Sequence, residues 1–115
     1  MVIILIRRFV RIDRIEQFFD TYRKQTPINN VAFRGETLTK ASEDAQLPPG
    51  LRGSALREPG SVTVLNIAKW DSWEAFAEQF ADELKKEAEH GFDPEIETAH
   101  RQRIVLDVFE DHPKQ

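Results

Sequence analysis

Three segments of the chain have the pattern of β-strands that are apolar on both faces: residues 2–10, 61–69 and 103–110. Side chains along a strand point alternately to its two sides, and in each of these segments apolar residues occupy both sides. An antiparallel sheet with one solvent-exposed face carries polar residues on that face. A sheet built from these strands therefore has to be buried on both faces. This need constrains the fold more than any other feature of the sequence.

A helix is predicted after the first of these strands. Its apolar residues recur at helical spacing along one stripe, and they are Ile12, Ile15, Phe18, Phe19 and Tyr22. Asp13 and Glu16 have the spacing of a capping box, in which side chains satisfy the free amides of the first turn. We expect Thr26-Pro27 to end this helix.

A second helix is predicted after Asp71, which we expect to cap it. Apolar residues follow at spacings of three and four over about four turns, within residues 73–88. Gly91 is well placed to end this helix. An acidic residue before Pro94 then has the pattern of a helix N-cap, which predicts a further short helix to about His100.

Residues 31–41 alternate between apolar and polar side chains, which predicts a half-exposed strand at the periphery of the sheet. The residues that we expect on its apolar face are Val31, Phe33, Thr37 and Thr39. The order of elements is therefore βαββαβ. We predict an α+β, ferredoxin-like domain over residues 1–110, with an antiparallel four-stranded sheet and two main helices, and a tail at 111–115 that frays.

Residues 42–60 contain three of the five glycines and three of the six prolines. A loop of this length is unusual in a compact domain, and such loops are commonly lids, binding loops or disordered segments. Its leucines and alanines are too apolar for a purely solvated linker. We therefore expect this segment to act as a lid over a ligand pocket.

Two helices can cover only one face of such a sheet. The other face, which carries Ile3, Leu5 and Phe9 or their alternates, has to be buried against something else. The simplest partner is a second copy of the chain, packed sheet against sheet, so we predict a homodimer through the open sheet face. The alternative is that residues 42–60 fold over this face.

The composition argues against several classes of function. The chain has no cysteine, so disulfide and thiolate chemistry do not contribute, and we expect a cytoplasmic protein. Its net charge of −4 is spread over interspersed acidic and basic residues, so we expect no nucleic-acid partner. No segment approaches the roughly 20 apolar residues of a membrane span, so we expect no membrane partner either.

The segment from Asn66 to Phe76 consists of an apolar strand, an aromatic residue, a short polar cap and a helix start that ends in Ala-Phe. It resembles the corresponding segment of the antibiotic-biosynthesis-monooxygenase-like (ABM) family of the dimeric α+β barrel superfamily. The resemblance implies that two sheets pack into a dimeric α+β barrel. It also implies the activities of that family, which include cofactor-free oxygenation of polycyclic phenols, haem degradation and isomerisation of small metabolites.

The residues do not support haem degradation. The haem-degrading members of that family have an asparagine near the end of the first strand, where this chain has Arg7 and Arg8. They have a tryptophan three residues past the phenylalanine of the helix start, where this chain has Gln79. They have a histidine ten residues further, where this chain has Glu89 followed by His90. We therefore predict no cofactor.

Six residues are candidates for a ligand pocket: Arg7, Tyr22, Asn66, Trp70, His90 and Asp107. Trp70 lies at a strand exit near the expected cavity, and Tyr22 belongs either to the core or to the ligand site. Arg7, Asn66 and Asp107 interrupt apolar strands and must find partners. They either line a cavity or bridge one another, as in an Arg7–Asp107 ion pair between neighbouring strands.

His90 and His100 each follow a glutamate by three residues, a spacing that occurs in di-iron carboxylate sites. Those sites lie inside four-helix bundles, whereas this chain is rich in strands. The helix dipole alone explains a histidine near a helix C-terminus. We therefore predict no metal site.

The sequence leaves open whether the chain is an enzyme. We predict an ABM-like domain that binds a small hydrophobic ligand, or that acts on such a metabolite as a cofactor-independent monooxygenase. The alternative is a non-catalytic domain for dimerisation or protein interaction. One structural feature separates the two, which is whether polar groups converge in a closed cavity.

Overall fold

The computed structural model describes residues 1–42, 48–50 and 60–114. Along the chain it contains β1 (Val2–Arg11), a 3-10 turn η1 (Ile12–Arg14), α1 (Ile15–Arg23), β2 (Phe33–Lys40), β3 (Ser61–Trp70), α2 (Trp73–Gln79), α3 (Ala81–His90) and β4 (Gln102–Asp107). The predicted βαββαβ order is confirmed. Most of the expected lid, residues 43–47 and 51–59, lies outside the described residues.

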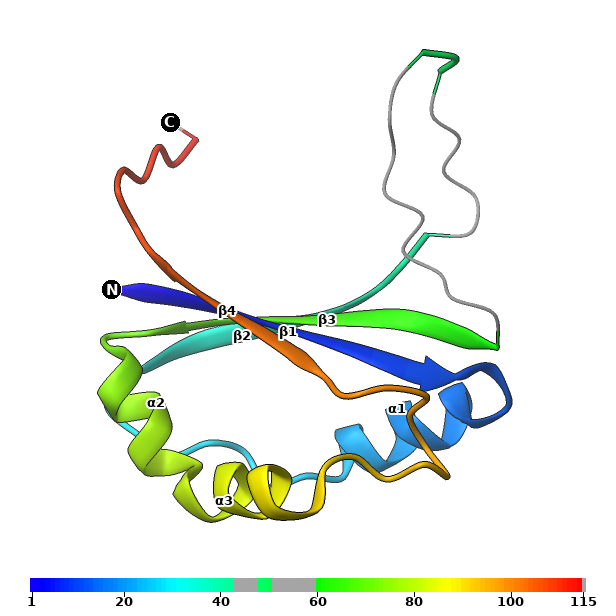
Figure 1. The fold of residues 1–115 in the computed structure, drawn as a ribbon. Coiled ribbons are helices and arrows are strands. Elements are labelled where there is room, and N and C mark those ends of the chain that lie inside the picture. The colour runs from blue at the N-terminus through cyan, green and yellow to red at the C-terminus, as the bar shows by residue number, and fades with distance from the viewer. Residues whose placement is uncertain (43–47, 51–59, 115) are drawn as a thin grey trace.

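The four strands form one antiparallel sheet in the order β2-β3-β1-β4 (Figure 1). β1 and β3 are central and pair along their whole length, from Val2 opposite Trp70 to Arg11 opposite Ser61. β2 and β4 lie at the two edges, and β4 is shorter than predicted because it ends at Asp107. This arrangement is the ferredoxin-like sheet that the sequence predicts.

All the helices of the described residues lie on the same side of the sheet, below it in Figure 1. The even-numbered residues of β1 and β3 point to this side. They form the core together with one residue each from α1 and α2, and the buried apolar set is Val2, Ile4, Val10, Val62, Val64, Ala68, Trp70, Phe18 and Phe76. Burial of one large apolar side chain of this kind contributes about 1.5–3 kcal/mol. The helices are therefore held to the sheet by apolar packing.

The opposite face of the sheet, which we call the open sheet face, carries the odd-numbered residues of β1 and β3. Ile3 and Leu5 are half-buried there, and Phe9 is buried. On β4 the side chains of Ile104 and Leu106 lie on the same face, and these residues are 55% and 42% exposed. No helix in the described part of the chain covers this face, and no helix there is long and apolar enough to cross a membrane.

The first helix begins later than the sequence predicts. Residues 12–14 form the turn η1, and α1 starts at Ile15. The predicted capping box does not form. The carboxylate of Asp13 accepts two hydrogen bonds from the guanidinium of Arg11, at 3.0 and 3.1 Å, so it does not cap the backbone amides.

The second predicted helix is divided into α2 and α3 at Phe80. The backbone of this residue leaves helical geometry, with φ −110° and ψ 24°, and its ring packs 4.9 Å from the ring of Phe76. The N-cap is Ser72 and not Asp71. Its Oγ accepts a hydrogen bond from the amide of Ala75 at 3.1 Å, which satisfies one free donor of the first turn.

The predicted short helix at 94–100 is wrong, because this segment forms turns and then runs beside the end of β1. The amide of Thr98 donates to the carbonyl of Phe9 at 2.9 Å, and Glu97 forms an isolated bridge with Val10. Backbone groups along the free edge of β1 thus take the hydrogen bonds that a helix would otherwise make internally.

β2 contains a bulge near its start. Phe33 lies opposite Trp70 and Glu36 lies opposite Ala68, so β2 uses one residue more than β3 over the same span. Gly35 lies within the bulge and has a φ of 104°, which favours glycine. The extra residue turns Glu36 and Leu38 toward the helices. The predicted common face of Phe33, Thr37 and Thr39 is therefore wrong.

Candidate functional site

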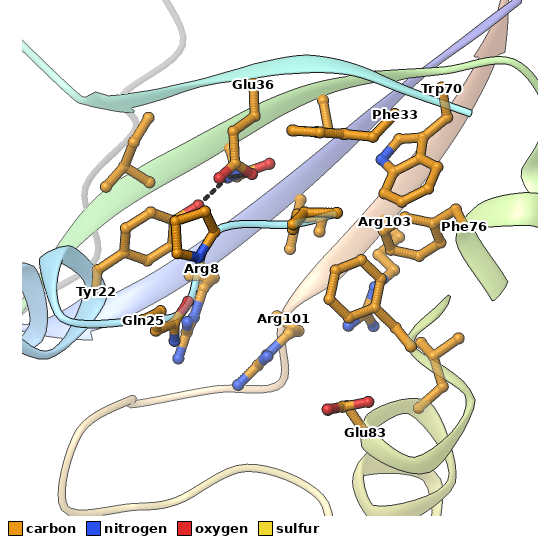
Figure 2. Close-up of a pocket in the computed structure, with 18 of the residues that line it drawn as sticks. Arg8, Tyr22, Gln25, Phe33, Glu36, Trp70, Phe76, Glu83, Arg101 and Arg103 are labelled. Carbon is orange, nitrogen blue, oxygen red and sulfur yellow. Dashed lines mark hydrogen bonds between the residues drawn. The ribbon is translucent and has the colours of Figure 1, made fainter. Parts of the chain in front are cut away.

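A cavity of about 570 Å³ lies between the helices and the helix-covered face of the sheet. β1, β2 and β3 supply its floor, and α1, the segment 25–28, α2, α3 and the beginning of β4 supply its sides (Figure 2). Ligand pockets in proteins commonly enclose roughly 300–1,000 Å³. The side chains around this cavity form three groups of different chemistry.

The first group is an aromatic wall made of Phe33, Trp70, Phe76 and Phe80. Trp70 is completely buried at the end of β3, and the ring centroid of Phe33 lies 5.1 Å from its own. The rings of Phe76 and Phe80 meet Trp70 edge-on, at 5.7 and 6.1 Å. Such contacts fix the orientation of each ring, so this side of the cavity suits a flat apolar molecule.

The second group is a polar cluster of Tyr22 and Glu36, which Figure 2 labels, together with Asn66. Nδ2 of Asn66 donates to the hydroxyl oxygen of Tyr22 at 2.6 Å and to Oε2 of Glu36 at 3.0 Å. Asn66 lies in the middle of β3 and is only 7% exposed, so its amide depends on these partners. A buried amide, a phenol and a carboxylate thus converge at one place in the cavity.

The phenol of this cluster has an altered acidity. Burial raises the pKa of Tyr22 to about 12, and the charge of Glu36 and a hydrogen bond with Glu36 act in the same direction. The hydrogen bond from Asn66 and the charge of Arg8 oppose them. Tyr22 therefore keeps its proton at neutral pH and is available as a hydrogen-bond donor.

The third group is a row of alternating charges, Arg8–Glu97–Arg101–Glu87–Arg103, which we call the arginine row. Nε of Arg8 donates to Oε1 of Glu97 at 2.7 Å, and Nη2 of Arg101 donates to Oε2 of Glu97 at 3.0 Å. Nε of Arg101 lies 3.2 Å from Oε1 of Glu87, and Arg103 donates to both oxygens of Glu87. The segment beside β1 explains this row, because it places the almost fully buried Glu97 between two arginines.

The arginines also change the acidity of Glu87. Burial disfavours its charged form, but the hydrogen bonds from Arg103 and the charges of Arg103, Arg101 and Arg8 outweigh burial. Together they hold the pKa of Glu87 below its usual value. Glu87 is therefore ionised at neutral pH and remains so into mild acid.

The structure brings three of the predicted pocket residues together in the cavity: Tyr22, Asn66 and Trp70. Arg7 lies on the open sheet face, where its guanidinium stands 4.6 Å from the ring centroid of Phe9. His90 is the last residue of α3, and its side chain is 77% exposed.

The predicted Arg7–Asp107 ion pair is wrong. In the pairing of β1 with β4, Arg7 lies opposite Gln102, whereas Asp107 lies opposite Val2 at the other end of the strand. The two side chains also point to opposite faces of the sheet, because Asp107 shares a face with Val2 and Arg7 does not. Neighbouring strands therefore do not bring these two residues together.

The two Glu-x-x-His motifs do not meet either. His100 packs edge-on against Phe92, with ring centroids 4.8 Å apart, while His90 points into solvent. Within residues 1–42, 48–50 and 60–114, no three histidine, cysteine, aspartate or glutamate side chains are grouped so that they could hold a metal ion.

Sequence reasoning missed seven polar residues of the cavity, and four of them belong to the polar cluster or to the arginine row: Arg8, Glu36, Arg101 and Arg103. Arg8 has a detectable signal, because the alternation that places Ile4 and Val10 in the core also places Arg8 on their face. Glu36 has none, because regular alternation from Phe33 points it away from the cavity and only the bulge reverses this.

No family model matches the chain, and no curated protein matches it in sequence. Among solved structures, the chain is similar to an arginine-to-serine mutant of MhuD crystallised with two manganese protoporphyrin IX molecules bound per active site. The TM-score is 0.65 and the sequence identity is 14%, and the similarity covers 99% of this chain and 100% of that one. A similarity of this extent at so low an identity is a statement about the fold.

The observed sheet order and the match over the whole length lead to the same result. The chain has an ABM-like fold, which is a ferredoxin-like α+β fold similar over its whole length to that of MhuD.

Proposed function

We propose that the chain is a small-molecule-binding domain, whose ligand is a flat hydrophobic molecule held in the cavity between sheet and helices. One observation carries the proposal: a ligand-sized space in which the buried amide of Asn66, a phenol and a carboxylate converge beside an aromatic wall. Protein interiors are otherwise close-packed, so a domain that serves only for dimerisation has no use for such a space. The cavity therefore favours ligand binding over that alternative.

The experiment is a titration of tryptophan fluorescence with a panel of neutral polycyclic phenols, because Trp70 forms part of the cavity wall. We expect saturable quenching in the wild type and its loss in Ala68→Phe, which fills the floor of the cavity. Ala81→Phe, at an exposed position of α3, is the matched control and should bind like the wild type. Equal binding by Ala68→Phe, or no saturable quenching with any phenol of the panel, would contradict the proposal.

We further propose oxygenation without a cofactor, for a bound phenol whose ring system contains a CH₂ group. The CH₂ carbon becomes a carbonyl, and dioxygen gives one oxygen atom to this carbonyl and the other to water, which takes up both hydrogens. Glu36 accepts the phenol proton and later returns it to the departing water, and the hydrogen bond from Nδ2 of Asn66 holds the carboxylate of Glu36 in position. Dioxygen uptake equal to the phenol consumed supports this step, and uptake that persists in Glu36→Gln contradicts it.

The porphyrin of MhuD does not suit the side chains of this cavity. The usual axial ligands of a haem-type group are histidine, cysteine, methionine and tyrosine. Among the described residues that line the cavity, Tyr22 alone is of these types, and its hydroxyl is held by Asn66. Its pKa of about 12 also disfavours the phenolate that would bind a metal. We therefore assign no step of the reaction to such a group.

We also propose that two copies of the chain associate through their open sheet faces. Aliphatic side chains on this face are half-buried or exposed, and Ile104 and Leu106 reach 55% and 42% exposure. Contiguous apolar surface of this kind commonly marks an interface. A symmetric dimer buries the same surface of both copies, which satisfies the need for cover on both faces of the sheet.

Light scattering at micromolar concentration tests the dimer and should give about twice the chain mass of 13.3 kDa. The double substitution Ile104→Lys/Leu106→Lys should give a folded monomer, because both side chains are already exposed in the single chain. Val105→Lys, on the same strand but pointing to the opposite face, is the control and should remain dimeric. A monomeric wild type would rule the interface out.

A further inference from the structure

We propose that the ligand of the cavity carries one carboxylate, and that Arg8 and Arg101 bind this group while the apolar body of the ligand lies against the aromatic wall. The inference rests on the proposed function, because it assigns a chemical class to the ligand of the same cavity. The observation behind it is the arginine row. This row carries more positive charge and more N–H donors than its own ion pairs use.

The arginine row has an excess of positive charge. It contains three guanidinium groups and two carboxylates, so its formal charge is +1. The three arginine side chains are only 19%, 26% and 20% exposed, so this charge lies largely out of water. Glu83 also lines the cavity, but in the described part of the chain no ion pair joins it to the row. An anion at this place stabilises a positive charge that the ion pairs of the row leave uncompensated.

Arg8 and Arg101 also have N–H groups that make no hydrogen bond within the described part of the chain. Arg8 donates to Glu97 through Nε, and among the described residues neither of its Nη atoms has a hydrogen-bond acceptor. Arg101 directs Nε and Nη2 toward glutamates, which leaves Nη1. A guanidinium presents five N–H donors in a planar fork that matches the two oxygens of a carboxylate. The remaining N–H groups of Arg8 and Arg101 can therefore donate to a carboxylate without displacing either glutamate.

Both arginines are held in position by the protein itself. The guanidinium of Arg8 lies 4.5 Å from the ring centroid of Phe18, and its Nε is fixed by the buried Glu97. Arg101 is fixed from two sides, by Glu97 and by Glu87. Ordered side chains lose little conformational freedom when a ligand arrives, so these donors bind an anion at low entropic cost.

The two guanidinium groups stand where the main cavity meets a smaller one of about 190 Å³. The residues that line both cavities are Arg8, Phe18, Tyr22, Gln25 and Arg101. Figure 2 shows the ends of Arg8 and Arg101 in the space between Gln25 and Glu83, apart from the rings of the aromatic wall. A ligand with an apolar body and a charged end therefore finds both surfaces within one connected space.

A matched pair of probes tests the inference: anthracene carboxylate, and anthracene carboxamide substituted at the same ring carbon. Both are titrated into the 115-residue chain and followed by tryptophan fluorescence at low and at high salt. We expect the wild type to bind the carboxylate at least about 10-fold more tightly at low salt, since hydrogen bonds to charged groups are the stronger ones. This preference should shrink at high salt, while carboxamide binding should not change.

Substitution of the arginines locates the effect. Arg8→Gln should reduce the preference to roughly 3-fold or less and leave carboxamide binding intact. Arg7→Gln, the adjacent arginine on the open sheet face, is the control and should keep the full preference. Because Arg8→Gln removes a partner of the buried Glu97, the double variant Arg8→Gln/Glu97→Gln is measured as well. Carboxamide binding shows that the cavity is intact in each variant.

The results of these titrations distinguish a failure of the carboxylate site from a failure of the proposed function. Equal affinity of the wild type for the two probes overturns the carboxylate site and leaves the cavity as a binding site. A preference that survives in both Arg8 variants overturns the role of this arginine. If neither probe binds to the wild type, the proposed function fails together with this inference.

Discussion

Tyr22 is the only tyrosine of the chain, so the ultraviolet absorbance of tyrosinate reports on this residue alone. Burial is the largest of the causes that raise its pKa from 10.0 to about 12, and the charge of Glu36 and its hydrogen bond come next. The substitution Glu36→Gln removes the charge and keeps the shape of the side chain. It therefore separates the part of the pKa shift that belongs to Glu36 from the part that belongs to burial.

The size of the expected change in the pKa of Tyr22 follows from the position of Glu36, which is an exposed residue on an edge strand. Two unit charges about 4 Å apart in a water-like medium interact by about 1 kcal/mol, and a change of one in pKa corresponds to about 1.36 kcal/mol. With a similar or smaller contribution from the hydrogen bond, we expect the midpoint of Tyr22 to fall from about 12 to about 11. It should stay above 10.0, because the substitution leaves the phenol buried.

The assay is an alkaline titration by difference absorbance, with circular dichroism recorded at each pH. Glu74→Gln, at an exposed position of α2, is the control and should titrate like the wild type. The reasoning is refuted if folded wild-type protein titrates near 10, or if Glu36→Gln leaves the midpoint unchanged. A steep transition that coincides with loss of the circular dichroism signal reports unfolding, and points in that range are excluded.

The same shift has a consequence for stability. The folded pKa of Tyr22 lies above its unfolded value, so its contribution is complete below pH 10 and is lost as the pH rises from about 10 to about 12. The free energy of unfolding measured in urea should therefore fall as the pH rises from about 10 to about 12, and it should fall less in Glu36→Gln.

Three further substitutions test the packing and the ion pairs. Trp70→Ala should lower the free energy of unfolding by about 3–5 kcal/mol in urea, since it empties a fully buried site; a loss below about 1 kcal/mol would contradict the core assignment. Gly91→Ala should lower the melting temperature, because φ is 72° there and the new Cβ would lie 2.8 Å from Cε1 of His100; removing the ring by His100→Ala should restore only part of the loss. Glu87 has a lowered pKa in the folded protein, so its contribution is present above its ordinary value of 4.5 and is lost as the pH falls further; Glu87→Gln should show a flatter acid profile, and an unchanged profile would count against the arginine row.

Local periodicity predicted the elements of the fold well, because a strand or a helix repeats its pattern within a few consecutive residues. The runs at 2–10 and 61–69 became the two central strands. The errors arose where a backbone or side chain found a partner outside its own element. Asp13 accepts hydrogen bonds from Arg11 and so does not cap the helix, and the segment at 94–100 pairs with the edge of β1.

The site was predicted in part for the same reason. Asn66 and Trp70 stand out within β3 itself, as a polar residue and an aromatic residue in or at the end of an apolar run. Arg101 and Arg103 do not, because charged residues at the start of an edge strand are common and their role depends on Glu87, which is distant in sequence. The alternation of side chains along β1 decided against Arg7 and in favour of Arg8, and the register between β1 and β4, which sequence periodicity leaves open, decided against the Arg7–Asp107 pair.

The bulge at Gly35 has a consequence for how chains of this fold are compared. Between Phe33 and Glu36 the number of residues, and not only their kind, decides whether a carboxylate or the hydroxyls of Thr37 and Thr39 meet a bound molecule. A side chain at position 35 disfavours the φ of 104°, and a straightened β2 would slip by one residue and exchange its two faces. A gain or loss of one residue in this stretch, which ordinarily counts as a neutral change in a surface strand, thus becomes a change of the chemistry that the cavity offers.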